Sequence, residues 1–147
     1  MAEAQRSVVV NVTREKFWSV ISDYEKYPAF IPEMRSVRIL ETKGNVQRVA
    51  FEIEIAVLAF TRKVHYTLEF TNTPPEKVRW RLIDSDMVKG NDGGWTLEPA
   101  GEGKTKATYQ IDLRLGALVP KAVSHFLAEQ SLPKLLEQFK GRAESLP

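Results

Sequence analysis

Residues 49–57 read Val-Ala-Phe-Glu-Ile-Glu-Ile-Ala-Val and carry the clearest structural signal in the chain. The odd-numbered positions are large and apolar, whereas the even-numbered positions hold alanine or glutamate. A period of two is typical of a β-strand that has one face in a core and the other in water. The stretch therefore predicts a half-buried strand.

The same alternation recurs in residues 63–70 and again in residues 106–113. Strands buried on both faces of a parallel sheet read as continuous apolar runs, so alternation indicates antiparallel pairing. Weaker strands are expected around these three, over residues 5–12, 35–43, 77–84 and 94–98. The connecting segments include Gly90-Asn91-Asp92-Gly93-Gly94, whose residues are typical of a turn and a bulge. Together these segments predict an antiparallel sheet of about seven strands.

Two short helical segments are expected after the first strand. Thr13 is suited to cap a helix that runs to about Asp23, because Phe17, Val20 and Ile21 recur at the spacing of one helix face. A second short turn should follow before the proline at position 28.

The C-terminal region has the pattern of a long amphipathic helix over residues 120–145, roughly 39 Å in length. Pro133 lies inside this helix and removes a backbone hydrogen bond. We therefore expect either a kink near Leu132 or a restart of the helix with Ser131 as its cap. The helix is long enough to cross the whole sheet.

Composition indicates one globular domain over residues 1–147. Hydrophobic residues make up 43% of the chain and charged residues 27%, as in soluble proteins that bury a core. The 21 Lys and Arg residues are interspersed with 19 acidic residues, which argues against a nucleic-acid partner. The N-terminus lacks the apolar run of a signal peptide and no stretch has the length of a membrane span, so we expect a cytoplasmic protein.

The sequence contains few residues or motifs that could bind a metal or a cofactor. The chain has no cysteine, and sixty residues separate its two histidines, His65 and His125. We find no Ser-His-Asp arrangement, no HExxH motif and no phosphate-binding glycine loop, so no cofactor is expected. By the alternation, His65 falls on the solvated outer face of the sheet. The sequence indicates no particular oligomeric state.

The segment from Phe17 to Pro32 carries a family resemblance, and its most specific part is Asp-x-x-x-Tyr-Pro-x-Phe-x-Pro, formed by Asp23, Tyr27, Pro28, Phe30 and Pro32. With the later Gly93-Gly94-Trp95 and residues 139–144, it resembles the polyketide cyclase/dehydrase and coenzyme Q-binding branch of the START-like (SRPBCC) superfamily over essentially the whole chain. The resemblance implies the α+β helix-grip fold. In this fold a curved seven-stranded antiparallel sheet surrounds a long C-terminal helix, and two short helices follow the first strand.

The resemblance also implies a cavity between sheet and helix that holds a small hydrophobic molecule. The alternation and the helix pattern identify the side chains that would face it: Phe51, Ile53, Ile55, Tyr66, Leu68, Phe70, Trp80, Leu82, Trp95, Leu97, Tyr109, Ile111 and Leu113 from the strands, and Val123, Phe126 and Leu127 from the helix. The alternative for each of them is a place in an ordinary packed core.

Three connecting segments carry apolar residues where loops are normally polar, and in an antiparallel order they fall at one end of the sheet. Their apolar residues are Leu58, Phe60, Met87, Val88, Leu118 and Val119. We interpret these as the rim and lid of the cavity, since equivalent loops gate the cavity in related ligand-binding proteins. Mutual capping of the open end of the core and transient contact with a membrane or protein partner are the alternatives.

The inward face holds few titratable groups. Its polar atoms are mainly the hydroxyls of Tyr66 and Tyr109 and the indole nitrogens of Trp80 and Trp95, with Asp84 at a strand end. This favours binding or transport of a lipid, quinone, isoprenoid or polyketide over catalysis. One alternative is a polyketide aromatase/cyclase or dehydrase in which Tyr66 or Tyr109 assists proton transfer. The other is a ribosome- or protein-associating module.

Overall fold

The computed structural model describes residues 2–57 and 59–147, and within them seven strands form one antiparallel sheet. The strands are β1 (Ala2–Val10), β2 (Met34–Lys43), β3 (Val46–Val57), β4 (Phe60–Thr73), β5 (Lys77–Ser85), β6 (Val88–Pro99) and β7 (Thr105–Leu115). Their order across the sheet is β1-β7-β6-β5-β4-β3-β2. The first strand therefore pairs with the last, and every other neighbouring pair is consecutive in the chain.

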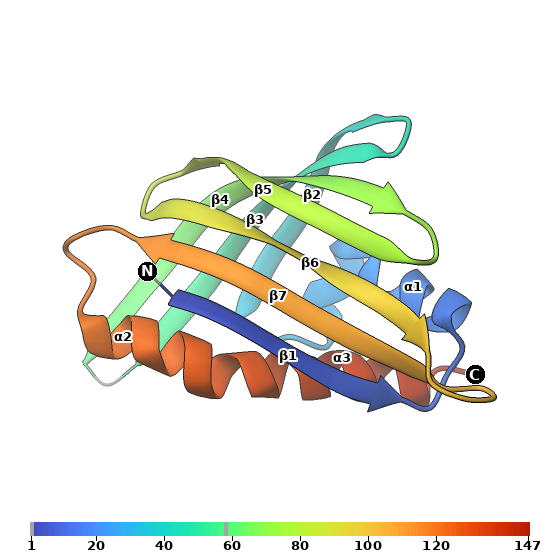
Figure 1. Ribbon diagram of the computed structural model, residues 1–147. Coiled ribbons are helices and arrows are strands. Elements are labelled where there is room, and N and C mark those ends of the chain that lie inside the picture. The colour runs from blue at the N-terminus through green and yellow to red at the C-terminus, as the bar shows by residue number, and fades with distance from the viewer. Residues whose placement is uncertain (1, 58) are drawn as a thin grey trace.

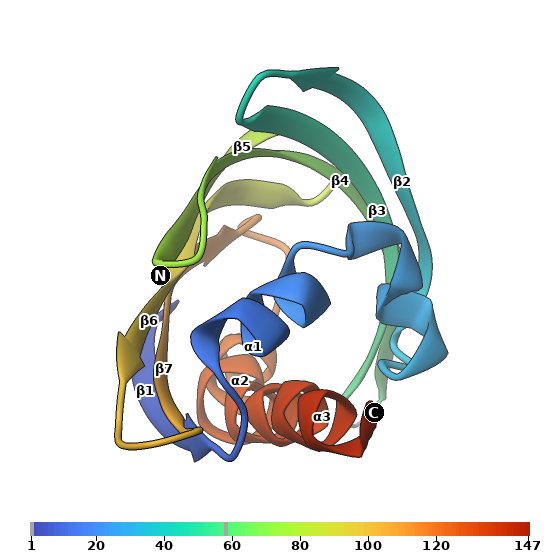
Figure 2. The ribbon, with the colours of Figure 1, turned by 90° about the vertical axis from the view of Figure 1, so that its right-hand side faces the viewer.

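The helices lie on the concave side of this sheet. Those after β1 are α1 (Arg14–Ile21) and the 3-10 helix η1 (Tyr24–Ala29), and the C-terminal run consists of α2 (Lys121–Phe126), η2 (Leu127–Ser131) and α3 (Leu132–Ser145). In Figure 1 the C-terminal run lies along the sheet, and Figure 2 shows the sheet curving around the helices. The helix-grip architecture predicted from the sequence is confirmed.

Strand β3 has the half-buried character that its alternation predicts. In β3 the side chains of Val49, Phe51, Ile55 and Val57 are buried, and the glutamates between them are partly exposed. The predicted helix cap is also confirmed, because the Oγ1 of Thr13 accepts a hydrogen bond from the backbone N–H of Lys16 at 3.2 Å.

The sequence predicts turn and bulge residues at positions 90–94, but the structure places this glycine-rich segment inside β6, so the turn is wrong. An irregularity typical of a bulge does occur at its start, where the register of β6 with β7 shifts between Val88 and Gly90. Gly93 faces Trp80 of β5 in the register, and a Cβ atom at Gly93 would stand 2.8 Å from Cζ2 of that indole and would also meet the Gln110 carbonyl oxygen. A Cβ at Gly94 would meet the Val78 carbonyl oxygen. These glycines therefore allow neighbouring strands and an indole ring to approach closely. Glycine serves this purpose within strands as well as in turns.

The C-terminal helical run changes its geometry before Pro133. η2 is a π-helical turn, in which the backbone N–H of Leu132 donates to the carbonyl of Leu127. The α-helix begins again at Leu132, directly after Ser131, so the interruption lies where the proline predicts it. Ser131 has helical backbone angles and forms no side-chain hydrogen bond, so its predicted role as a cap is wrong. No helix among the described residues is long and apolar enough to span a membrane.

Buried side chains form two clusters. The larger one, here called the main core, contains the aromatic residues of α1, η1, the central strands and α3. The smaller one, here called the distal cluster, consists of Ile55, Val57, Val64, Val88 and Val123. Three partly buried residues, Ile53, Tyr66 and Leu82, pack against both clusters. The protein interior is therefore divided, and the boundary between the two parts is where a cavity opens.

Candidate functional site

A cavity of about 550 Å³ lies between the C-terminal helices and the curved sheet. Its walls come from the C-terminal half of β3, the C-terminal half of β7, the π-helical turn and the first half of α3. This volume is within the range of about 300–1,000 Å³ that is typical of small-molecule sites. Most of the side chains that face it are apolar.

Several residues predicted to face a cavity do border it. They are Ile53, Ile55, Tyr66, Ile111, Leu113, Phe126 and Leu127. Tyr66 is the only aromatic hydroxyl in this set, and its ring stacks on Phe51 with the ring centroids 5.0 Å apart. Burial raises the pKa of the Tyr66 hydroxyl, so it remains protonated and can act as a hydrogen-bond donor.

The other predicted wall residues lie away from the cavity. Phe51, Leu68, Phe70, Trp80, Trp95, Leu97 and Tyr109 belong to the main core, Val123 belongs to the distal cluster, and Leu82 packs between the two. The physical reason is that helix side chains fill this part of the concave face. Tyr24 packs on Phe70 at 4.3 Å between ring centroids, and Phe17 and Phe139 each approach the ring of Trp95 to 5.3 Å.

The predicted rim is mostly closed. Val88 borders the cavity, but Phe60, Met87 and Val119 are half-buried against the distal cluster. Leu118 is 97% exposed, and Leu58 lies outside the described residues. The arrangement matches the alternative in which these loops cap one end of the core. Asp84 is exposed and does not point inward.

The polar border of the cavity lies elsewhere, where the start of β2 faces α3. The Glu33 carboxylate accepts a hydrogen bond from Nζ of Lys134 at 2.8 Å, and Arg35 is 3.3 Å from the carboxylate of Glu54. All four of these residues border the cavity. Burial acts to raise the pKa of Glu33, but the hydrogen bond and charge of Lys134, together with hydrogen bonds from a backbone N–H and from Gln138, hold the pKa below its ordinary value.

No local pattern in the sequence predicts this charged border. Glu33 and Lys134 are 101 residues apart, and each looks like an ordinary solvated charge in its own segment. The one feature that indicates its position is the short link between the family motif and β2. This link must bring the chain from η1 to the edge of the sheet. We call the four residues Glu33, Arg35, Glu54 and Lys134 the charged border.

A second polar group in the cavity wall was missed because its segment was predicted as a turn. Asn91 of β6 is 7% exposed and borders the cavity. The Nε1–H of Trp80 donates to its Oδ1 at 3.0 Å. The cavity wall therefore carries a buried amide whose orientation is fixed by a neighbouring indole.

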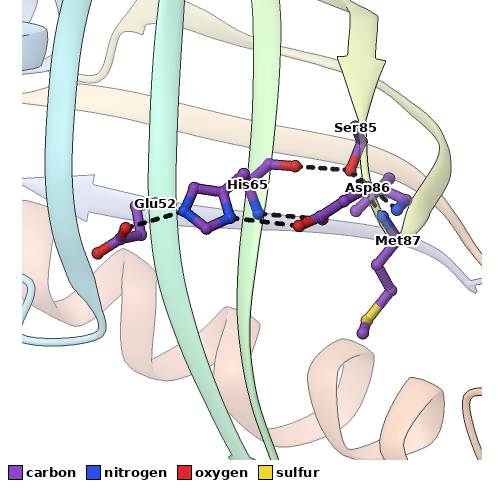
Figure 3. A network of polar contacts seen from close by, with 6 residues as sticks. Glu52, His65, Ser85, Asp86 and Met87 are labelled. Atoms are coloured by element: carbon purple, nitrogen blue, oxygen red, sulfur yellow. Dashed lines mark hydrogen bonds and ion pairs between the residues drawn. The ribbon is translucent and has the colours of Figure 1, made fainter.

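On the opposite, outer face, His65 lies in a network that Figure 3 shows at close range. Its Nε2 is 2.9 Å from a carboxylate oxygen of Glu52, and its Nδ1 is 3.2 Å from one of Asp86. The hydrogen bonds with Glu52 and Asp86 raise the pKa of His65. His65 is exposed, as the alternation predicts, and it contributes to the sheet surface rather than to the cavity.

The matching family model is described as "Polyketide cyclase / dehydrase and lipid transport" and covers residues 10–140. The chain belongs to this family, which agrees with the resemblance found in the sequence. A relative known by function is the ribosome association toxin RatA of Escherichia coli K12, which is 23% identical over 147 residues, covering 99% of this chain and 89% of the toxin.

Solved structures agree on the fold. A START superfamily protein from Mycobacterium smegmatis superposes with a TM-score of 0.85 at 22% identity, covering 100% of both chains. The Zhui aromatase/cyclase from Streptomyces sp. R1128 has a TM-score of 0.83 at 20% identity, covering 97% of this chain and 93% of the enzyme. At these identities the structures establish the fold, and the function must be argued from the site itself.

Proposed function

We propose that this protein binds a small hydrophobic molecule in the cavity between the sheet and the C-terminal helices. The observation that carries the proposal is the contrast between the two parts of the interior. Aromatic rings fill the main core, whereas about 550 Å³ stays open at the boundary with the distal cluster. Protein interiors are normally close-packed, with few voids larger than a water molecule, so a space of this size supports a binding role.

Apolar burial would supply most of the affinity. Each Å² of apolar ligand surface removed from water contributes about 25 cal/mol. The walls offered by Ile53, Ile55, Ile111 and Leu113 are suited to this contribution. The charged border, at the edge of the cavity, is the natural place for a ligand to enter, because its ion pairs are solvated and weak.

Carriage or storage is favoured over catalysis by the placement of the titratable groups. Of the two tyrosines considered for proton transfer, Tyr66 borders the cavity and Tyr109 lies in the main core. Burial raises the pKa of both hydroxyls, which makes them poor general bases near neutral pH. The carboxylates at the cavity, Glu33 and Glu54, are paired with cations of the charged border.

The test uses the uncharged fluorescent probe N-phenyl-1-naphthylamine and one pair of matched variants. Leu135→Trp places an indole in the cavity wall, whereas Leu40→Trp makes the same change at an exposed position of β2. We expect the unaltered protein and Leu40→Trp to bind the probe alike and Leu135→Trp to bind it at least about tenfold more weakly, a difference of about 1.4 kcal/mol. Circular dichroism verifies that both variants are folded.

Native mass spectrometry of the freshly purified protein, followed by organic extraction, would identify a ligand retained from the cell. Failure of the unaltered protein to bind the probe, or equal binding by the two tryptophan variants, would contradict a ligand site in this cavity.

Ribosome association is a second candidate, and the observation in its favour is the likeness to RatA along 99% of the chain. It would use the protein surface rather than the cavity. Co-sedimentation with ribosomes at low salt tests it, since a weak electrostatic contact should be strongest there. Absence of the protein from the ribosome pellet at low salt would eliminate this candidate.

A further inference from the structure

The amide of Asn91 is held in one orientation by its surroundings. An indole N–H can only donate, so the atom that faces Nε1 of Trp80 must be the amide oxygen, and the amide NH2 must point the other way. This removes the usual ambiguity between the two amide atoms.

The indole itself is tightly positioned. Gly93 lies two residues from Asn91 on the same face of β6, and its lack of a side chain leaves room for the ring of Trp80. Phe70 and Tyr109 pack against the same indole at 5.8 Å and 5.3 Å between ring centroids. Since Trp80 cannot easily turn, the direction of the Asn91 amide is set before any ligand arrives.

The NH2 group of Asn91 forms no hydrogen bond within the described part of the chain, although the residue is buried and borders the cavity. Tyr66 also borders the cavity, and its hydroxyl likewise has no partner among the described residues. Among the described residues, the fully buried side-chain atoms without a partner are Oε2 of Glu33 and Oδ1 of Asp112, so the free groups of Asn91 and Tyr66 are accessible from the cavity, where a ligand can bond to them. The wall thus offers two neutral donors to whatever occupies the cavity.

We propose that Asn91 is the specificity-determining residue of the cavity, and that its NH2 group donates to the carbonyl oxygen of an uncharged, largely apolar ligand. The inference rests on the proposed ligand-binding function and narrows the ligand class to ketones and other neutral carbonyl compounds. A hydrocarbon would leave the amide unsatisfied. A carboxylate would be disfavoured, because the cations at the cavity, Arg35 and Lys134, are already paired with Glu54 and Glu33.

The test compares three probes with one naphthalene ring system: 1-acetylnaphthalene, 1-ethylnaphthalene and 1-naphthoic acid. Each displaces N-phenyl-1-naphthylamine in a competition titration. We expect the ketone to bind roughly fivefold more tightly than the ethyl compound, the effect of one net hydrogen bond, and the acid to bind most weakly.

Asn91→Asp retains an oxygen for the Trp80 N–H and replaces the donor with an acceptor. It should abolish the preference for the ketone. Gln110→Glu makes the same change from amide to acid on the exposed outer face of β7 and should preserve the preference. A second readout is the infrared carbonyl stretch of 1-acetylnaphthalene labelled with carbon-13 at the carbonyl. This stretch should shift to lower wavenumber when the ketone binds to the unaltered protein. The shift should be absent when it binds to Asn91→Asp.

The results distinguish a failure of the role proposed for Asn91 from a failure of ligand binding in the cavity. Equal binding of the ketone and the ethyl compound to the unaltered protein, with no shift of the carbonyl stretch, refutes the role of Asn91 and leaves the cavity proposal intact. Tightest binding of 1-naphthoic acid also refutes it and indicates an anionic ligand held at the charged border. Failure of all three probes to displace N-phenyl-1-naphthylamine also refutes the role of Asn91, whereas failure of N-phenyl-1-naphthylamine itself to bind contradicts ligand binding in the cavity.

Discussion

Two adjacent leucines of α3 provide a direct measure of whether the cavity exists in solution. Leu136 is 3% exposed and lies in the main core, whereas Leu135 is partly buried and borders the cavity. Both can be shortened to alanine by the same chemical change at the same place in the helix. Because helix propensity is equal for the two substitutions, any difference between them reports on packing.

The expected magnitudes follow from the space around each side chain. Leu136→Ala opens a new void among close-packed rings and should lower the free energy of unfolding by about 3 kcal/mol, within the range for buried leucine. Leu135→Ala only enlarges an existing space, so we expect a loss of about 1 kcal/mol. With a urea m-value of about 2 kcal/mol per molar, the unfolding midpoints should fall by about 1.5 M and 0.5 M respectively.

Urea titration followed by tryptophan fluorescence measures both midpoints, and a binding titration supplies an independent comparison. Leu135→Ala should change the affinity for N-phenyl-1-naphthylamine, whereas Leu136→Ala should alter it little while the protein remains folded. Equal losses of stability in the two variants would refute the assignment of Leu135 to a cavity wall. A larger loss for Leu135→Ala would show that the helix presents a different face to the sheet.

Three further predictions concern stability. Gly93→Ala should destabilise the protein by about 1–3 kcal/mol, because the new Cβ would overlap Trp80 and a backbone oxygen. A Cβ at Gly141 would meet no atom within 4 Å, so Gly141→Ala should stabilise α3 by about 0.5–1 kcal/mol. Thermal unfolding of the two variants measures both effects. The pKa of His65 is raised in the folded protein, so the protonated imidazole stabilises the fold. This stabilisation is complete below the ordinary histidine pKa of 6.5 and is lost as pH rises through the higher folded-state pKa. His65→Gln should therefore flatten this part of a plot of Tm against pH. Thr13→Ala removes the cap of α1 and should cost about 1 kcal/mol, and an equal midpoint in urea would contradict the capping role.

The sheet could be predicted from sequence because alternation is a local property. In β3, β4 and β7 the large apolar residues at alternate positions face the interior, and the residues between them face outward. The same dependence on local pattern makes the prediction of a turn at residues 90–94 wrong. Glycine and asparagine in a row have turn chemistry locally, and only the indole of Trp80, on the neighbouring strand, explains why they belong to a strand.

Alternation identifies the inward face of a strand but not the depth at which a side chain ends. Ile53 and Phe51 are two residues apart on the same face of β3, yet one borders the cavity and the other lies in the main core. The difference comes from η1 and α3, whose aromatic rings pack against one part of the concave surface. A cavity is what the packed segments leave open, so it depends on contacts between distant parts of the chain that no single pattern contains.

Pro133 connects the helix pattern to the shape of the cavity. Proline cannot donate to the carbonyl four residues before it, and the chain responds with a widened turn in which Leu132 bonds to Leu127, five residues back. Val123 and Leu132 are both buried, although positions nine residues apart stand on opposite sides of an ideal α-helix, which turns roughly 100° per residue. The widened turn reduces this rotation, so that α2 can face the distal cluster and α3 the main core. The turn itself, through Leu127 and Ser131, then forms the cavity wall between them.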